Sequence, residues 1–210
     1  MFYERDLGIT SAWNDNPRVG NPVRSDLVVQ YMAFTREEQK KAGVLVKQAP
    51  ALSDSHLKEI ITPMRIRMHY TCNTKKWVTL ARDIALYAVA FRTTKRGDEL
   101  SRTLIQRILR LPNESGLLFN FQWGKSMRDG ADHLLTITYD NRSLAICPVR
   151  AGEQYILIGT AAGWDMTKGY LFPTITDGNG EAGTRRGTSP LSAAQMTKGL
   201  KSYAVAAGIS

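Results

Sequence analysis

The sequence predicts a mainly α-helical domain with a small antiparallel β-sheet, an α+β fold. Apolar residues recur at helical spacing over most of the chain, whereas two short segments alternate apolar and polar residues as strands do. With 43 % hydrophobic and 22 % charged residues, the 210-residue chain has the composition of a globular protein and not of a disordered one.

The N-terminal residues 1–48 are interpreted as a separate unit. The first 20 residues are polar and interrupted by glycine and proline, a pattern typical of a loose leader. One helix is then expected, with Ser25 or Asp26 as its N-cap and its end in the charged run before Gly43. Because a lone amphipathic helix usually packs against another element, we interpret this unit as the remnant of a preceding domain, linked to a main domain of residues 49–210.

Five helices are expected in the main domain. The most apolar one spans Trp77–Phe91 and is predicted to lie buried at the centre, because its apolar residues surround most of the helix. An earlier helix begins near Ser53 and contains Pro63, which is expected in an early turn or at a kink. The other three helices are predicted over residues 98–109, 149–164 and 192–207.

The two expected strands cover residues 117–123 and 134–139, where apolar and polar residues alternate. The polar stretch between them, Gly124–Gly130, is predicted to form the tip of a long hairpin. A glycine- and arginine-rich segment, residues 177–188, is interpreted as a loop.

Several classes of protein do not fit the sequence. No apolar run approaches the roughly 20 residues that a membrane span requires, and the N-terminus has no signal-peptide pattern. The two cysteines, Cys72 and Cys147, are expected to be free thiols. The histidines, His56, His69 and His133, are too far apart for a metal-binding motif, so we predict neither a metal nor another cofactor.

The chain is strongly basic, with 28 lysine and arginine residues against 19 acidic ones, a net charge of +9 and a pI of about 9.7. Such an excess attracts polyanions, and nucleic acid is the commonest polyanion that a protein of this size meets. The alternative interpretation is a basic protein whose charges are simply solvated.

The segment 81–100 carries the most informative pattern. Arg82 lies in the apolar helix, and Arg96 follows at the junction with the next helix. An arginine held by rigid elements on both sides is suited to bind an anion. Glu99 is expected in the first turn of the next helix, where a carboxylate interacts favourably with the positive end of the helix dipole.

This segment resembles the tyrosine recombinases, the phage-integrase superfamily, whose catalytic core has Arg-Asp-x-Ala-Leu followed by Arg-x-x-Glu-Leu. The family's next features follow in the same order, namely a hairpin with Gly124-Lys125 and the sequence Leu171-Phe172-Pro173. Residues 95–100 and 189–192 are most similar to the Crypton-like recombinases of eukaryotic transposons. The resemblance covers residues 53–210. It implies a tyrosine-recombinase catalytic-core-like fold behind the remnant of an N-terminal DNA-binding (core-binding) domain.

The resemblance also implies a reaction and roles for particular residues. In this family a tyrosine attacks a DNA phosphodiester and forms a 3′-phosphotyrosyl bond, which a second strand end reverses. Arg96 matches the first phosphate-binding arginine, and Lys125 matches the lysine that protonates the leaving 5′ oxygen, with Arg128 or Lys95 as alternative donors. Glu99 is expected to support the site structurally. The expected DNA-binding residues are Lys95, Arg128, Arg185 and Arg186.

The sequence departs from the family after its last helix, because the family's His-x-x-Arg motif and nucleophile are expected later than that helix. Tyr155, Tyr170 and Tyr203 all come too early to be the nucleophile. We therefore expect a C-terminally truncated core that does not cleave DNA alone, since removal of the nucleophile abolishes covalent catalysis.

Double-stranded DNA is the expected partner, with no membrane, and a homo-oligomer on DNA is expected because family members act as tetramers. The expected location is nuclear in a eukaryote and otherwise cytoplasmic. One alternative is a non-catalytic basic DNA-binding module derived from a mobile element. Another is a basic α+β protein that acts on small anions or has a structural role.

Overall fold

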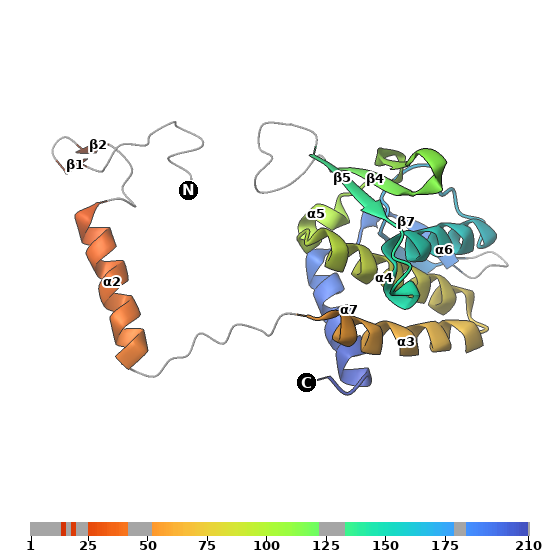
Figure 1. Cartoon of the computed structure of the whole chain (residues 1–210), viewed down its shortest axis with the longest axis horizontal. Coiled ribbons are helices and arrows are strands. Elements are labelled where there is room, and N and C mark those ends of the chain that lie inside the picture. Colours follow the sequence, from red (N-terminus) through yellow and green to blue (C-terminus); the bar gives the residue numbers. More distant parts are fainter. Residues whose placement is uncertain are drawn as a thin grey trace. The chain divides into compact units, whose positions relative to one another are not determined.

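The computed structural model describes residues 14–15, 18–19, 25–41, 52–121, 133–178 and 184–209 (Figure 1). The chain divides into two units, Met1–Ala51 and Leu52–Ser210. Over its described residues, the second unit is mostly helical with small antiparallel sheets, which confirms the predicted α+β class.

In the first unit, helix α2 spans Asp26–Lys41. The hydroxyl of Ser25 accepts a hydrogen bond from the Val28 N–H at 3.3 Å, so Ser25 is the residue that caps the helix. Two short antiparallel strands, β1 (Asn14–Asp15) and β2 (Arg18–Val19), precede it. The helix is where the sequence predicted it, and the origin of this unit stays a prediction.

Helix α3 spans Asp54–Tyr70 and begins at the cap Ser53, whose hydroxyl accepts the His56 N–H at 3.3 Å. Pro63 lies in the middle of this helix, and so the expected position in an early turn is wrong. A proline removes one backbone hydrogen bond from a helix interior. The helix tolerates this loss because residues on both sides of Pro63, including Ile60, Ile61 and Met64, are anchored in the core.

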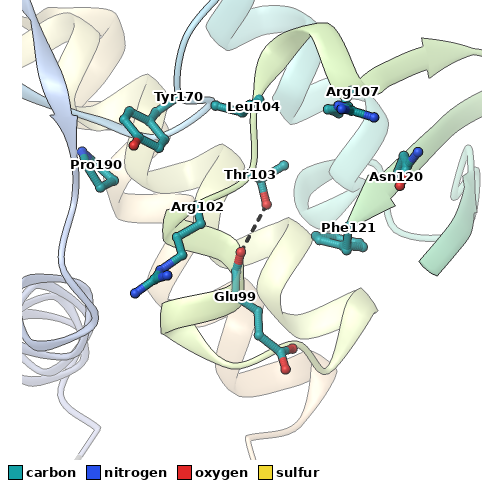
Figure 2. Close-up of a pocket in the computed structure, with 9 residues that line it drawn as sticks. All are labelled: Glu99, Arg102, Thr103, Leu104, Arg107, Asn120, Phe121, Tyr170 and Pro190. Carbon is teal, nitrogen blue, oxygen red and sulfur yellow. Dashed lines mark hydrogen bonds between the residues drawn. The ribbon is translucent and has the colours of Figure 1, made fainter. Parts of the chain in front are cut away.

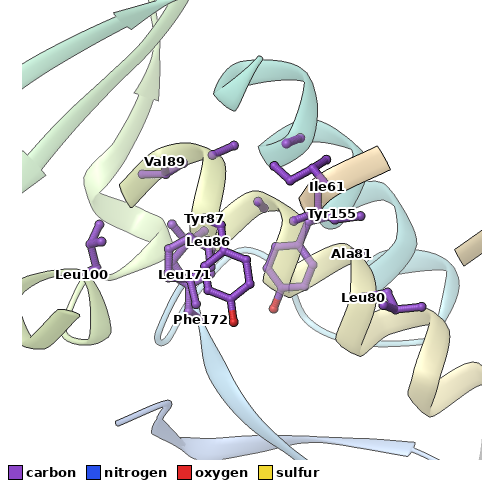
Figure 3. Packing of buried hydrophobic residues seen from close by; sticks show 14 of the residues in the cluster. Ile61, Leu80, Ala81, Leu86, Tyr87, Val89, Leu100, Tyr155, Leu171 and Phe172 are labelled. Carbon is purple, nitrogen blue, oxygen red and sulfur yellow. The ribbon is translucent and has the colours of Figure 1, made fainter. Parts of the chain in front are cut away.

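Helix α4, Thr74–Thr93, is the central helix that the sequence predicted. It packs against α3 on one side and against α6, Pro148–Ala161, on another. Figure 3 shows Leu86, Tyr87 and Val89 from α4 in the core around it. The apolar residues around α4 are explained by this position between other elements.

The prediction of one helix over residues 98–109 is wrong. Helix α5 covers only Gly97–Ser101, and a 3₁₀ turn, η2 (Ile105–Arg107), and strand β3 (Ile108–Arg110) follow it. β3 pairs with the next strand along the chain, and this pairing satisfies backbone groups that a helix would have satisfied internally.

A three-stranded antiparallel sheet in the order β3-β4-β5 contains the predicted hairpin. Strand β4 spans Gly116–Phe121 and strand β5 spans His133–Thr138, with Phe121 opposite His133. Phe119 and Phe121 point into the core from alternate positions of β4, and their rings stack with centroids 5.7 Å apart. The period-2 pattern therefore predicted the strand and its buried face correctly.

The glycine- and arginine-rich segment is not a loop over its described residues. Strand β6 (Pro173–Asp177) pairs antiparallel with β7 (Thr184–Pro190), and so Arg185 and Arg186 lie in a strand. Residues 184–190 did not predict a strand, because glycine, arginine and threonine replace the usual alternation of apolar and polar residues. Strand β7 is stabilised by its pairing with β6 and by the hydrogen bonds of Arg186 to the carbonyls of residues 165–170.

Helix α7, Ala193–Ala206, ends the described chain and was predicted correctly. Ser192 caps its start, and Gly208 follows its end with a φ of +78°, a conformation that glycine adopts without steric cost. α7 packs against α5 and α3. Gly199 allows close contact with α4, because a Cβ at this position would lie 2.6 Å from the Tyr87 hydroxyl.

Candidate functional site at the junction of α4 and α5

Arg96 lies between α4 and α5, the position that the sequence predicted for it. Thr94, the C-cap of α4, has a φ of 51°, so the chain turns sharply out of the helix. Arg96 follows as the N-cap of α5, and its side chain is exposed. The junction thus holds the backbone of Arg96 between two helices while its guanidinium faces solvent.

Glu99 supports this junction from the first turn of α5. Its carboxylate accepts a hydrogen bond from the Arg96 N–H at 3.4 Å and lies 3.8 Å from the Lys95 ammonium. Only 10 % of its side chain is exposed. Glu99 therefore contacts both residues that precede α5, and its role in supporting a site stays a prediction.

Lys95 connects the junction to the hairpin. Its ammonium lies 2.8 Å from His133 Nδ1 at the start of β5 and 5.1 Å from the ring centre of Phe121 at the end of β4. Its side chain is 11 % exposed. The side chain of Lys95 is therefore mostly buried against other residues of the protein, which the sequence did not predict. Contact between Lys95 and DNA stays a prediction.

Lys125 and Arg128 lie outside the described residues. In the sequence they fall between Phe121 and His133, both of which Lys95 contacts. Their assignments as general acid and DNA-binding residue stay predictions.

A pocket of about 450 Å³ opens beside Glu99, and Figure 2 shows the side chains around it. Two arginines, Arg102 at the end of α5 and Arg107 in η2, contribute positive charge to its lining. The remaining lining residues come from α5, the segment between α5 and η2, β4, and the segments around Tyr170 and Pro190. The pocket is lined by Glu99, Arg102, Thr103, Leu104, Arg107, Asn120, Phe121, Tyr170 and Pro190.

Two chain segments that are distant in sequence form one wall of this pocket. The Leu171 N–H donates to the Thr103 carbonyl at 2.8 Å, and the Ile105 N–H donates to the Gly169 carbonyl at 2.9 Å. The Gln106 side chain adds a third bond by accepting the Gly169 N–H at 3.0 Å. These bonds fix the path of the chain on both sides of Leu104 and Tyr170.

Arg186 fastens the same wall from strand β7. Its guanidinium donates to the carbonyls of Asp165 at 3.1 Å, Lys168 at 2.7 Å and Tyr170 at 2.5 Å. Arg186 therefore does not lie in the loop that the sequence predicted, and its side chain crosslinks the turn ahead of Tyr170. Arg185 is exposed, and DNA contact by either arginine stays a prediction.

The turn that Arg186 holds is closed by Asp165. The Thr167 N–H and hydroxyl donate to the Asp165 carboxylate at 2.9 and 2.5 Å. These two hydrogen bonds from Thr167, with a further one from Lys168, stabilise the ionised form and lower the pKa of Asp165 to about 2.

Arg82 and Asp83, the first motif of the resemblance, form a buried pair away from solvent, with 6 % and 5 % of their surfaces exposed. Arg82 Nε and Nη2 donate to Asp83 Oδ1 at 2.9 and 2.7 Å, and Nη1 donates to the Pro173 carbonyl at 2.9 Å. The Tyr203 hydroxyl donates to Asp83 Oδ2 at 3.0 Å. The cluster joins α4 to β6 and α7.

Burial determines the ionisation of this cluster. Desolvation raises the pKa of the Asp83 carboxyl, while the charge and hydrogen bonds of Arg82 oppose the shift. Desolvation, with the negative charge of Asp83 nearby, also raises the pKa of Tyr203 well above its usual value. Tyr203 therefore donates its hydroxyl proton to Asp83 within the fold, and the expectation that it is no nucleophile stays a prediction.

Among the described residues, no group of three or more histidine, cysteine or acidic side chains is arranged to hold a metal ion. No described helix is long and apolar enough to cross a membrane. Cys72 is exposed and Cys147 is buried, each as a free thiol.

No protein-family model matches the sequence, and no curated protein is similar to it at a significant level. The function of the chain is therefore inferred from its own residues. Of these residues, sequence reasoning missed Arg102 and Arg107. The nearest signal was that both are basic and follow Arg96 closely in the chain.

Proposed function

We propose that this chain is a DNA-binding core of the tyrosine-recombinase type. The observation that carries the proposal is the exposed Arg96 at the junction of α4 and α5, with Glu99 and Lys95 beside it and the base of the β4–β5 hairpin in contact with Lys95. This arrangement follows the order of features that the resemblance predicts.

The proposed chemistry assigns one task to each residue. Arg96 would neutralise negative charge on the non-bridging oxygens of a phosphodiester, since guanidinium binds phosphate with two parallel hydrogen bonds. Lys125 would protonate the 5′ oxygen that leaves when a tyrosine oxygen forms its bond to phosphorus. Because that bond conserves the energy of the phosphodiester, rejoining would require only the reverse transfer.

None of the three histidines in the 210 residues is followed by arginine three positions later. We therefore propose that this polypeptide binds duplex DNA and does not cleave it by itself. The second candidate, a non-catalytic DNA-binding module derived from a mobile element, is favoured by the same observation. Assembly into a homo-oligomer on DNA and, in a eukaryote, location in the nucleus belong to the same proposal.

The test is the affinity of the purified chain for a labelled DNA duplex, measured by fluorescence anisotropy at several salt concentrations. We expect the logarithm of the association constant to fall steeply with the logarithm of salt, by about 0.9 for each phosphate contacted. Absence of binding at low salt would contradict both candidates. A covalent protein–DNA complex, resistant to denaturant, would contradict the proposed lack of cleavage.

A further inference from the structure

We propose that the outer edge of strand β5 is an interface between two copies of this chain. The two β5 strands pair in antiparallel orientation, with Thr136 of one copy opposite Thr136 of the other. The inference goes beyond the proposed function, because this pairing requires no DNA. The chemistry that recognises the partner is that of backbone hydrogen bonds between two strands.

The outer edge of β5 carries backbone groups that no described strand pairs with. β5 is the last strand in the order β3-β4-β5, so β4 covers only one of its edges. On that edge the Tyr139 N–H donates to the Ser115 carbonyl at 3.3 Å. Because hydrogen-bonded and non-hydrogen-bonded pairs alternate along the ladder, the backbone groups of Leu134, Thr136 and Thr138 point away from β4.

The described residues leave a groove beside this edge. Its volume is about 590 Å³, and five consecutive residues, 135–139, line it. Successive side chains of a strand point to opposite faces of the sheet, so a groove that borders five residues in a row follows an edge of the strand. Since β4 occupies the other edge, this groove lies along the outer edge of β5.

The charges in the groove do not favour a polyanion such as DNA as its occupant. Two basic side chains in the lining, Arg92 and Arg142, are balanced by two acidic ones, Asp54 and Asp140. Arg92 is also paired with Asp140. An occupant that binds mainly through its backbone fits this balance better than a strongly charged one.

β5 lacks the features by which edge strands usually avoid pairing. Exposed edge strands are commonly short, or they carry lysine, proline or a bulge. β5 spans His133–Thr138, contains no proline, lysine, arginine or acidic residue, and keeps a regular register with β4. The opposite edge strand of the sheet, β3, has only 3 residues and ends at the exposed Arg110. Of the two edges of this sheet, that of β5 is therefore the one suited to pair with another strand.

The edge of β5 is complementary to itself. When Thr136 lies opposite Thr136 of the second copy, Leu134 lies opposite Thr138, so outward backbone groups meet outward backbone groups. The two strands then share about six hydrogen bonds. The side chains of these three residues are exposed, and contacts between them across the two strands add to the stability of the pair. A second copy supplies the matching spacing by symmetry, which favours it over an unrelated strand.

The experiment measures self-association of the full chain without DNA, by sedimentation velocity over a series of protein concentrations. Thr136→Lys and Thr136→Glu are studied alone and as an equal mixture. Each variant alone places two like charges directly opposite each other, whereas the mixed pair places lysine opposite glutamate. Thr197→Lys and Thr197→Glu are the matched controls, because Thr197 is exposed on α7.

We expect the wild type to form a dimer whose fraction rises with protein concentration. Each Thr136 variant alone should raise the dissociation constant of the dimer about fivefold. The mixture should dimerise at least as tightly as the wild type. The Thr197 variants, alone or mixed, should behave as the wild type does. Circular dichroism establishes that each variant is folded. If a Thr136 variant does not fold, a mixture of Leu134→Lys with Thr138→Glu tests the same register.

A wild type that stays monomeric at every concentration would overturn this inference. The salt dependence of duplex binding would then still decide the proposed function by itself. Self-association that the Thr136 variants weaken no more than the Thr197 variants do would overturn the assignment to β5. A mixture that dimerises no more tightly than either Thr136 variant alone would overturn the register.

Discussion

Arg82 and Arg96 belong to the same stretch of sequence, yet the structure uses them in opposite ways. Arg82 is buried in α4, and its donors are taken by Asp83 and the Pro173 carbonyl. Arg96 lies just past the end of α4 with its side chain exposed. Burial and the supply of internal acceptors, rather than membership of a motif, therefore separate a structural arginine from one that is available to a ligand.

The adjacent residues Arg185 and Arg186 repeat this difference on strand β7. Because successive side chains of a strand point to opposite faces, Arg186 reaches three carbonyls while Arg185 is exposed. The two pairs of arginines therefore provide matched variants for testing the account.

The largest effect is expected from Asp83→Asn. This change leaves the buried Arg82 without its counter-charge and should lower the free energy of unfolding by about 3 kcal/mol. Urea denaturation measures the change, with the exposed Asp98→Asn as the control, for which we expect less than about 0.5 kcal/mol. The apolar double variant Arg82→Met with Asp83→Leu should be more stable than Asp83→Asn, because it leaves no unpaired charge. A loss below about 1 kcal/mol for Asp83→Asn would contradict the structural role of the pair.

The next effect concerns Arg186→Ala. Removal of its guanidinium leaves three carbonyls without a donor and should lower the free energy of unfolding by about 2 kcal/mol. Arg185→Ala removes the same charge from the exposed neighbour and should change stability by less than about 0.5 kcal/mol. Chemical denaturation of the two variants measures both changes in the free energy of unfolding. Equal decreases for Arg186→Ala and Arg185→Ala would contradict the role of Arg186 as a crosslink.

A smaller effect is expected from Tyr203 at alkaline pH. Its pKa in the folded protein is raised by burial and by Asp83, so the unfolded chain loses this proton near pH 10 while the folded chain keeps it. Its contribution to stability is therefore complete below pH 10 and is lost as the pH rises above that value. Between pH 10 and 11, Tyr203→Phe should lose about 1 kcal/mol less stability than the wild type, as measured by denaturation at each pH. Parallel losses in the two proteins would contradict the assignment.

The sequence predicted most of the helices because their patterns are local. The apolar residues around α4, and Ser53 ahead of an apolar run, indicate helices from neighbouring residues alone, and the structure agrees. β3 was missed because Leu104 and Ile108, four residues apart, fit helical spacing, and only pairing with β4 makes residues 108–110 a strand. That pairing depends on residues beyond the reach of a local pattern.

The candidate site was predicted only in part, for a similar reason. Arg96 and Glu99 are neighbours in sequence, so their arrangement at the start of α5 follows from helix capping. The contacts of Lys95 with His133 and the carbonyls bound by Arg186 join distant segments, which a single sequence does not reveal. The pocket lined by residues of α5, β4 and Tyr170 likewise joins segments that are distant in sequence, so it could not be predicted from the sequence.

Binding of the DNA backbone by Arg96 is tested by the salt dependence of duplex binding by Arg96→Gln compared with the wild type. If Arg96 contacts a DNA phosphate, the slope of the logarithm of the association constant against the logarithm of salt should decrease in magnitude by about 0.9. The free energy of unfolding should change by less than about 0.5 kcal/mol, as expected for an exposed side chain. An unchanged slope in a folded Arg96→Gln variant would contradict the claim that this arginine binds the DNA backbone.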